Sequence, residues 1–261
     1  MADSVAVESV MLRAGFWRRA VAFLIDALII ALPMQVLVIV LFALTDGSVQ
    51  SRFGIYGTVC NELPSLPIVP TMAPPPDYNS IVDCRVTLAG FDMARTLTVS
   101  RVTLEGGVTT RISHVYYLGA DGKQRDVWSI DLLAYLVFFA YLVVLESRHG
   151  ATLGKRLLSI RTTRSDDALA PGISVRSALL RYGVMFAALV PGILVTFGYS
   201  LAVGYGGGDP YALLSHPAFV GGNIVAGLIF FGWFAWIIVS VVRKRDPVYD
   251  RAAGTSVWKR P

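Results

Sequence analysis

The sequence predicts an all-α integral membrane helical bundle of four transmembrane helices, with a small β-rich insert outside the membrane. Two observations support this prediction. Only 16% of the 261 residues are charged, whereas soluble domains carry about 25%. In addition, four apolar stretches each contain at most one charged residue and reach the length of about 20 residues that crosses a bilayer.

These stretches divide the chain into eight segments. We expect, in order, the N-terminal tail with the first helix (1–44), the external insert (45–126), the second helix (127–146), an amphipathic cytoplasmic connection (147–181), the third helix (182–203), a short external loop (204–219), the fourth helix (220–242) and a cytoplasmic tail (243–261).

The basic residues predict the orientation. With the N-terminus inside, 16 of the 23 lysines and arginines fall in cytoplasmic segments, and the short loop 204–219 carries none. Cytoplasmic loops carry the excess of positive charge in membrane proteins. We therefore expect a multi-pass protein of the cell membrane with both termini in the cytoplasm. The first apolar run is about twice as long as the apolar core of a signal peptide and contains Asp26, which argues against cleavage.

The external insert changes character along its length. Its first half is rich in proline and predicts extended chain or polyproline II. Its second half contains three β-branched runs, at 84–88, 95–104 and 111–118, separated by Gly106-Gly107 and related turn residues. Such runs predict a β-hairpin or a three-stranded sheet.

The only two cysteines, Cys60 and Cys84, both lie in this insert. Thiols in an oxidising compartment favour a disulfide, and two unrelated buried thiols are the alternative. A zinc site is not indicated, because the two cysteines and His114 fall short of four ligands.

No arrangement of residues indicates catalysis. Gly150 to Lys155 resembles a phosphate-binding loop, but only three residues separate its glycines and Arg156 replaces the required Ser or Thr. The three histidines are scattered and suggest neither a metal site nor a catalytic triad. We therefore expect no enzyme and no cofactor. The net charge of +5 does not indicate nucleic-acid binding, because it reflects membrane orientation.

Asp26 is the one charged residue inside the first apolar stretch, and carboxylates at such positions are costly. Arg19 precedes it by seven residues, about 20° short of two full turns, and therefore shares its helix face. Arg18 lies about 80° round the helix. Asp26 then either pairs with a cation or takes up and releases a proton.

Three blocks of the sequence, 15–26, 150–161 and 249–255, resemble the RDD family of bacterial membrane proteins, over residues 11–258 with the insert between them. The resemblance implies that the arginine of the family is Arg19, with Arg18 as the alternative, and that its aspartates are Asp26 and Asp250. It also implies a cytoplasmic family motif at Thr152, Gly154 and Lys155. The insert is longer than the loop usual in the family.

Two functions remain open. The resemblance implies transport, since the family is suspected of it and a few members are associated with sodium/proton antiport. The cluster of Arg19, Asp26 and Asp250 would then bind a proton or small cation. Four helices are few for a pore, so transport requires a homo-oligomer or a larger membrane complex. The alternative is a structural or accessory protein in the lipid bilayer, in which the cluster is a fixed ionic contact and the external domain binds a protein partner.

Overall fold

The structure is a computed structural model that describes residues 12–165, 172–206, 213–214 and 216–259. The chain forms two compact units. One comprises Met1–Asp26 and Phe139–Pro261, and the other comprises Ala27–Phe138.

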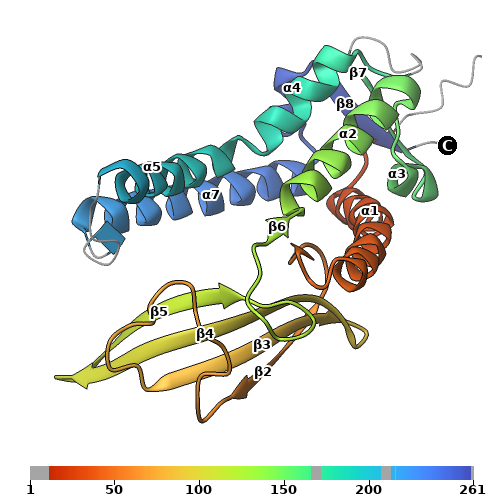
Figure 1. The fold of residues 1–261 in the computed structure, drawn as a ribbon. Helices are drawn as coiled ribbons and strands as arrows, with labels where there is room; N and C mark the ends of the chain where they lie inside the picture. Colours follow the sequence, from red (N-terminus) through yellow and green to blue (C-terminus); the bar gives the residue numbers. More distant parts are fainter. Residues whose placement is uncertain (1–11, 166–171, 207–212, 215, 260–261) are drawn as a thin grey trace, which may run out of the picture. The chain divides into compact units, whose positions relative to one another are not determined.

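The described chain begins with a long helix, continues with strands between residues 49 and 129, and is mainly helical after them (Figure 1). The elements are, in order, α1 (Phe16–Leu44), β1 (Val49–Gln50), β2 (Gly57–Glu62), β3 (Ser80–Leu88), β4 (Phe91–Glu105), β5 (Val108–Tyr117), β6 (Trp128–Ser129), α2 (Asp131–His149), α3 (Leu153–Leu157), β7 (Ile160–Arg164), α4 (Val175–Met185), the 3-10 helix η1 (Ala187–Leu189), α5 (Val190–Gly206), α7 (Pro217–Val242), α8 (Val248–Ala252) and β8 (Thr255–Lys259).

The prediction of an all-α bundle is wrong. About 50% of the chain is helical and 24% is strand, and the strands include a four-stranded antiparallel sheet. The β-branched runs of the insert pair over greater lengths than the sequence suggested, since β4 alone has 15 residues. Two short two-stranded sheets also form, β1 with β6 and β7 with β8, and the second of these joins the segment expected to be an amphipathic connection to the expected tail.

Three described helices are long and apolar enough to cross a membrane: α1, α2 and α7. A fourth span is possible if α4 and the segment Ala187–Val203 count together, but they are bent by 43°. The break lies before Pro191, which therefore falls in the first turn of α5, where proline costs the helix no hydrogen bond.

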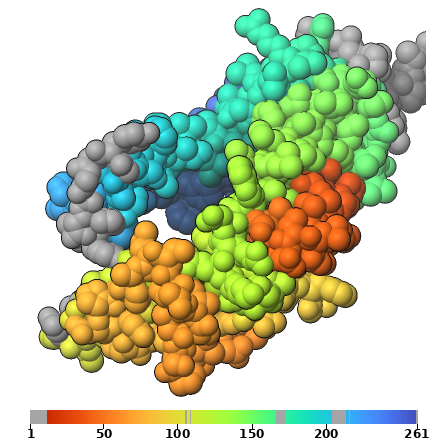
Figure 2. Space-filling view, viewed as in Figure 1, coloured from red at the N-terminus to blue at the C-terminus, as the bar shows by residue number. Residues whose placement is uncertain are grey.

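In the unit Ala27–Phe138, the sheet has the order β2-β3-β4-β5. The proline-rich segment between β2 and β3 crosses one face of this sheet (Figure 1), and its atoms, coloured orange, cover that face in Figure 2. Leu63, Leu66 and Ile68 from this segment pack on the buried side chains of the sheet, among them Leu97 and Val99. The segment is therefore an apolar cover for one face of this sheet.

The prediction of a disulfide is confirmed in the structure, which joins Cys60 to Cys84. The two cysteines are directly opposed in the register of β2 and β3. This pairing explains the fourth strand. Residues 57–62 are exposed throughout, and the covalent link ties this edge strand to the sheet.

In the other unit, β7 and β8 pair antiparallel, with Thr162 opposite Val257. Ile160 and Val257 from these strands are buried with Ala14 and Ala22. The two strands thereby place α3 and α8, from distant parts of the sequence, beside the beginning of α1. The polar groups described below lie in this region.

Replacing both cysteines, as Cys60→Ser with Cys84→Ser, should lower the free energy of unfolding of the external sheet by about 2–4 kcal/mol, because the bridge restricts the unfolded chain. Thermal unfolding of the purified protein measures this. Reductant should lower the melting temperature of the wild type and leave the double variant unchanged. Equal sensitivity of both proteins to reductant would contradict the assignment.

Candidate functional site

Asp26 on α1 is 1% exposed and accepts three hydrogen bonds. Its Oδ1 accepts from the Tyr141 hydroxyl and from the backbone N–H of Gly154, each at 2.7 Å. Its Oδ2 accepts from the Thr152 hydroxyl at 2.5 Å. Asp26 is thus held by neutral donors of α2 and of the segment that leads into α3.

The segment Thr152 to Lys155 is built for this contact. Thr152 is the N-cap of the short helix α3, where its hydroxyl also accepts from the N–H of Lys155. A Cβ on Gly154 would collide with the Ala22 carbonyl oxygen and lie 3.0 Å from the Asp26 carboxyl carbon. Only glycine therefore allows α3 to approach α1 closely enough for its backbone N–H to reach Asp26.

Arg19, near the beginning of α1, is largely buried and forms an ion pair with Asp250 on α8. Its Nη1 lies 2.8 Å from Asp250 Oδ2, and its Nε donates to the Ala14 carbonyl at 3.1 Å. Asp250 is 0% exposed and accepts a further hydrogen bond from Thr255 at 3.2 Å. Arg18 is exposed. Arg19 is therefore the arginine that the structure brings to Asp250.

Arg181 on α4 connects Asp250 to a second buried carboxylate. Its Nε lies 2.9 Å from Asp250 Oδ1, and its Nη1 donates to Glu146 Oε2 at 2.9 Å. Glu146, in the last turn of α2, is 0% exposed and also pairs with Lys155 Nζ. The hydroxyl of Thr162 on β7 lies between Glu146, Lys155 and Arg181, and it accepts a hydrogen bond from Arg181 at 2.7 Å.

These contacts form a continuous row of alternating charges, which we name the ionic chain: Lys155, Glu146, Arg181, Asp250 and Arg19. Three cations face two carboxylates, so one positive charge is in excess. The rings of Tyr182 and Tyr249 lie 5.8 and 5.5 Å from the Arg181 guanidinium carbon. Aromatic faces attract such a cation and add to its neutralisation.

Burial and the positive charge of Arg181 together lower the pKa of Lys155 to about 8, although the neighbouring Glu146 raises it. Lys155 is the member of the ionic chain outside the candidate spans whose charge can change near neutral pH.

The structure therefore brings together some of the residues singled out from the sequence and separates others. It joins Arg19 to Asp250, and it joins Asp26 to Thr152 and Gly154. It does not pair Arg19 with Asp26. Their shared helix face still leaves them about 10 Å apart along the axis, and each has a nearer partner on another element.

Sequence reasoning missed Glu146 and Arg181. Glu146 was interpreted as a charge at the membrane surface, and Arg181 only as part of the cytoplasmic positive charge. Their positions were the available signal, because Glu146 directly follows one apolar segment and Arg181 directly precedes another. Nothing in the sequence pairs residues 35 positions apart. Within the described ranges, no group of three or more His, Cys, Asp or Glu residues could hold a metal ion.

A sequence model described as the RDD family matches residues 85–254. This range includes Thr152, Gly154, Lys155 and Asp250, and begins after Arg19 and Asp26. No curated protein and no solved structure matches the chain.

Asp250→Asn should lower the free energy of unfolding by about 3–5 kcal/mol, because it leaves Arg19 and Arg181 buried without their shared carboxylate. Thermal unfolding in detergent measures the change. Asp77→Asn is the matched control, since Asp77 is 85% exposed in its pair with Arg101 and exposed pairs contribute little. Similar stability of the two variants would show that the buried pair is not structurally important.

Gly154→Ala should destabilise the protein by about 1–3 kcal/mol, because its methyl group would push α3 away from α1. Gly183→Ala is the control, since a Cβ at this helical position meets nothing within 4 Å. That control should leave stability unchanged or raise it slightly. A harmless Gly154→Ala would refute the close approach of α3 to Asp26.

Proposed function

The chain belongs to the RDD family, and we propose that it is an accessory protein of the cell membrane in which the ionic chain is a fixed structural contact. The proposed protein crosses the membrane several times, has both termini in the cytoplasm and is without catalytic activity. Its external sheet would bind a protein partner.

The arrangement of charges supports the cytoplasmic placement. Apolar helices α1, α2 and α7 support insertion into a lipid bilayer. The members of the ionic chain come from the beginning of α1, the end of α2, the segment from α3 to α4 and the chain after α7. In the proposed orientation all of these ends face the cytoplasm, and the disulfide-linked sheet lies on the oxidising side, where disulfides persist.

One observation carries the structural interpretation: every charge in the ionic chain is already paired with another member. Glu146 and Asp250 are each bound by two cations. An incoming cation would therefore have to displace an arginine or Lys155. Removing a buried partner is costly, so this arrangement favours a permanent contact between α2, α4, α8 and α1.

The partner-binding role is supported by the edge of the external sheet. All six residues of β2 are exposed, and β2 is an edge strand. Exposed edges can pair with a strand of another protein. The large hydrophobic residues Val59 and Ile55, on or beside this strand, are more than half exposed.

Lys155 favours a second candidate function, the transport of a proton or small cation by an oligomer. Its pKa of about 8 lets it release a proton near neutral pH. Glu146 would then lose one of its two cations and could bind a small cation in its place. Asp26, which accepts a hydrogen bond from the N–H of Gly154 next to Lys155, would be the second carboxylate on such a route.

Proteoliposomes containing a pH-sensitive dye separate the two functions. The structural proposal predicts that the wild type moves no more protons or sodium ions than protein-free vesicles. Transport would instead appear as flux that is lost in Lys155→Met and Asp26→Asn and kept in Asp77→Asn. Such flux, changing in rate around pH 8 and only when Lys155 is present, would overturn the structural proposal.

A further inference from the structure

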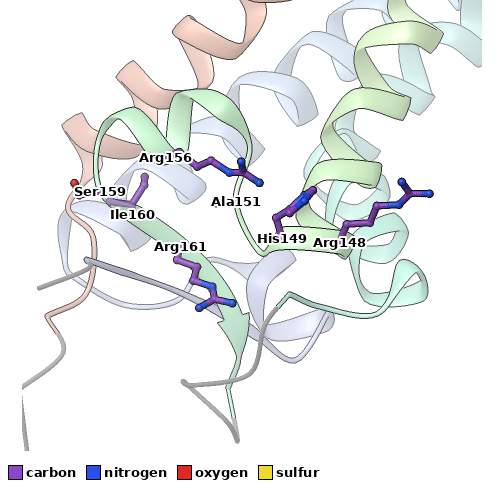
Figure 3. Close-up of a pocket in the computed structure, with 7 residues that line it drawn as sticks. All are labelled: Arg148, His149, Ala151, Arg156, Ser159, Ile160 and Arg161. Carbon is purple, nitrogen blue, oxygen red and sulfur yellow. The ribbon is translucent and has the colours of Figure 1, made fainter.

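A cavity of about 430 Å³ opens between the end of α2, the helix α3 and the strand β7. We propose that it is a binding site for a phosphate group, carried either by the headgroup of an anionic phospholipid or by free phosphate. Figure 3 shows the residues around it, with Arg148 and His149 from α2, Arg156 from α3, and Ile160 and Arg161 from β7.

The lining is strongly basic. Three arginines and one histidine contribute to it, together with Ala151, Ser159 and Ile160, and none of the lining residues that the structure describes is acidic. This differs from the neighbouring ionic chain, in which each cation has a carboxylate. Arg148, His149 and Arg156 are exposed, and no ion pair of theirs is found within the described chain.

Arg161 gives the second observation. Its Nε atom is buried and has no hydrogen-bond partner among the described residues. Burying a guanidinium N–H without an acceptor is costly. An oxyanion bound in the cavity would place a negative charge beside this guanidinium group and offset part of that cost.

The fold holds Arg161 in this position. The N–H of Thr162 donates to the Gly150 carbonyl at 2.7 Å, which fastens β7 to the turn after α2. Gly150 has a φ of 67°, and a Cβ there would lie 2.7 Å from the Thr162 carbonyl and 3.0 Å from Arg161 Nε. Glycine therefore permits the arginine of β7 to lie against the turn, facing the basic end of α2.

The chemistry of the lining selects phosphate. Guanidinium groups bind phosphate oxygens with paired hydrogen bonds. The cavity volume falls within the range of about 300–1,000 Å³ that is usual for small-molecule sites. Buried Ala151 and Ile160 supply apolar surface beside the charges. A sugar or glycerol carrying a phosphate group fits this combination.

The position of the cavity suggests a lipid as one source of the phosphate. It adjoins the end of α2, a candidate span, and basic pockets on the cytoplasmic side of membrane proteins bind anionic headgroups. This source rests on the proposed topology. Binding of free phosphate does not depend on the topology. If the topology is wrong, phosphate still binds and lipid is not retained; if the site is wrong, neither binds.

Two measurements on the full-length protein test the proposal. In a zwitterionic detergent, calorimetric titration with inorganic phosphate should show saturable binding at one site. In nanodiscs of phosphatidylcholine with phosphatidylglycerol, native mass spectrometry should show retained phosphatidylglycerol. Saturation by phosphate without lipid retention identifies free phosphate as the ligand, and lipid retention identifies the headgroup. Either result supports the site.

Arg148→Gln with Arg156→Gln removes two exposed charges and should weaken binding about tenfold or more, since each charged hydrogen bond is worth about 1.5–3 kcal/mol. Arg161→Gln should weaken it comparably. The matched control, Arg243→Gln with Arg251→Gln, removes two exposed arginines outside the cavity and should bind as the wild type. Absence of both phosphate and lipid binding overturns the proposal. Equal weakening in the control also overturns it, because it would show nonspecific attraction by net charge.

Discussion

The structure of the helical unit depends on one interaction, the bridge that Arg181 makes between Glu146 and Asp250. All three side chains are almost completely buried, and none could be buried alone at acceptable cost. The bridge joins the end of α2 to α4 and α8, and Arg19 extends it to α1. Charge pairing thus fixes how these short segments are arranged around the beginning of α1.

Asp26 solves a similar problem by different means. It lies deeper along α1 than Arg19 and has no basic partner in the described structure. Two hydroxyls and one backbone N–H donate hydrogen bonds to it instead, and Gly154 leaves room for its backbone N–H to reach the carboxyl group. Together, the ionic chain and the Asp26 contacts connect α1 to the segment 147–181 at two positions along the helix. Both depend on α3, which supplies Lys155 to the first and Gly154 to the second.

The distribution of unpaired positive charge follows from this arrangement. The ionic chain uses Lys155 and Arg181 inside the unit, while Arg148, Arg156 and Arg161, from the same elements, surround the adjacent cavity. Residues next to one another in sequence, such as Lys155 and Arg156, therefore have opposite roles. One is 9% exposed and bound to a carboxylate, and the other is exposed beside a basic cavity.

The sequence by itself determined the apolar helices, the family resemblance, the cysteine pair and the β-branched runs of the insert, because composition and periodicity are local properties. Sequence alone did not determine the extent of the sheets: β2 becomes a strand because Cys60 lies opposite Cys84, and β7 because β8 arrives from the end of the chain. Nor did it determine the partners of the charges. Helix geometry correctly placed Arg19 and Asp26 on one face. Their partners come from other elements, Asp250 for Arg19 and Gly154 for Asp26, and these contacts exist only in the folded chain.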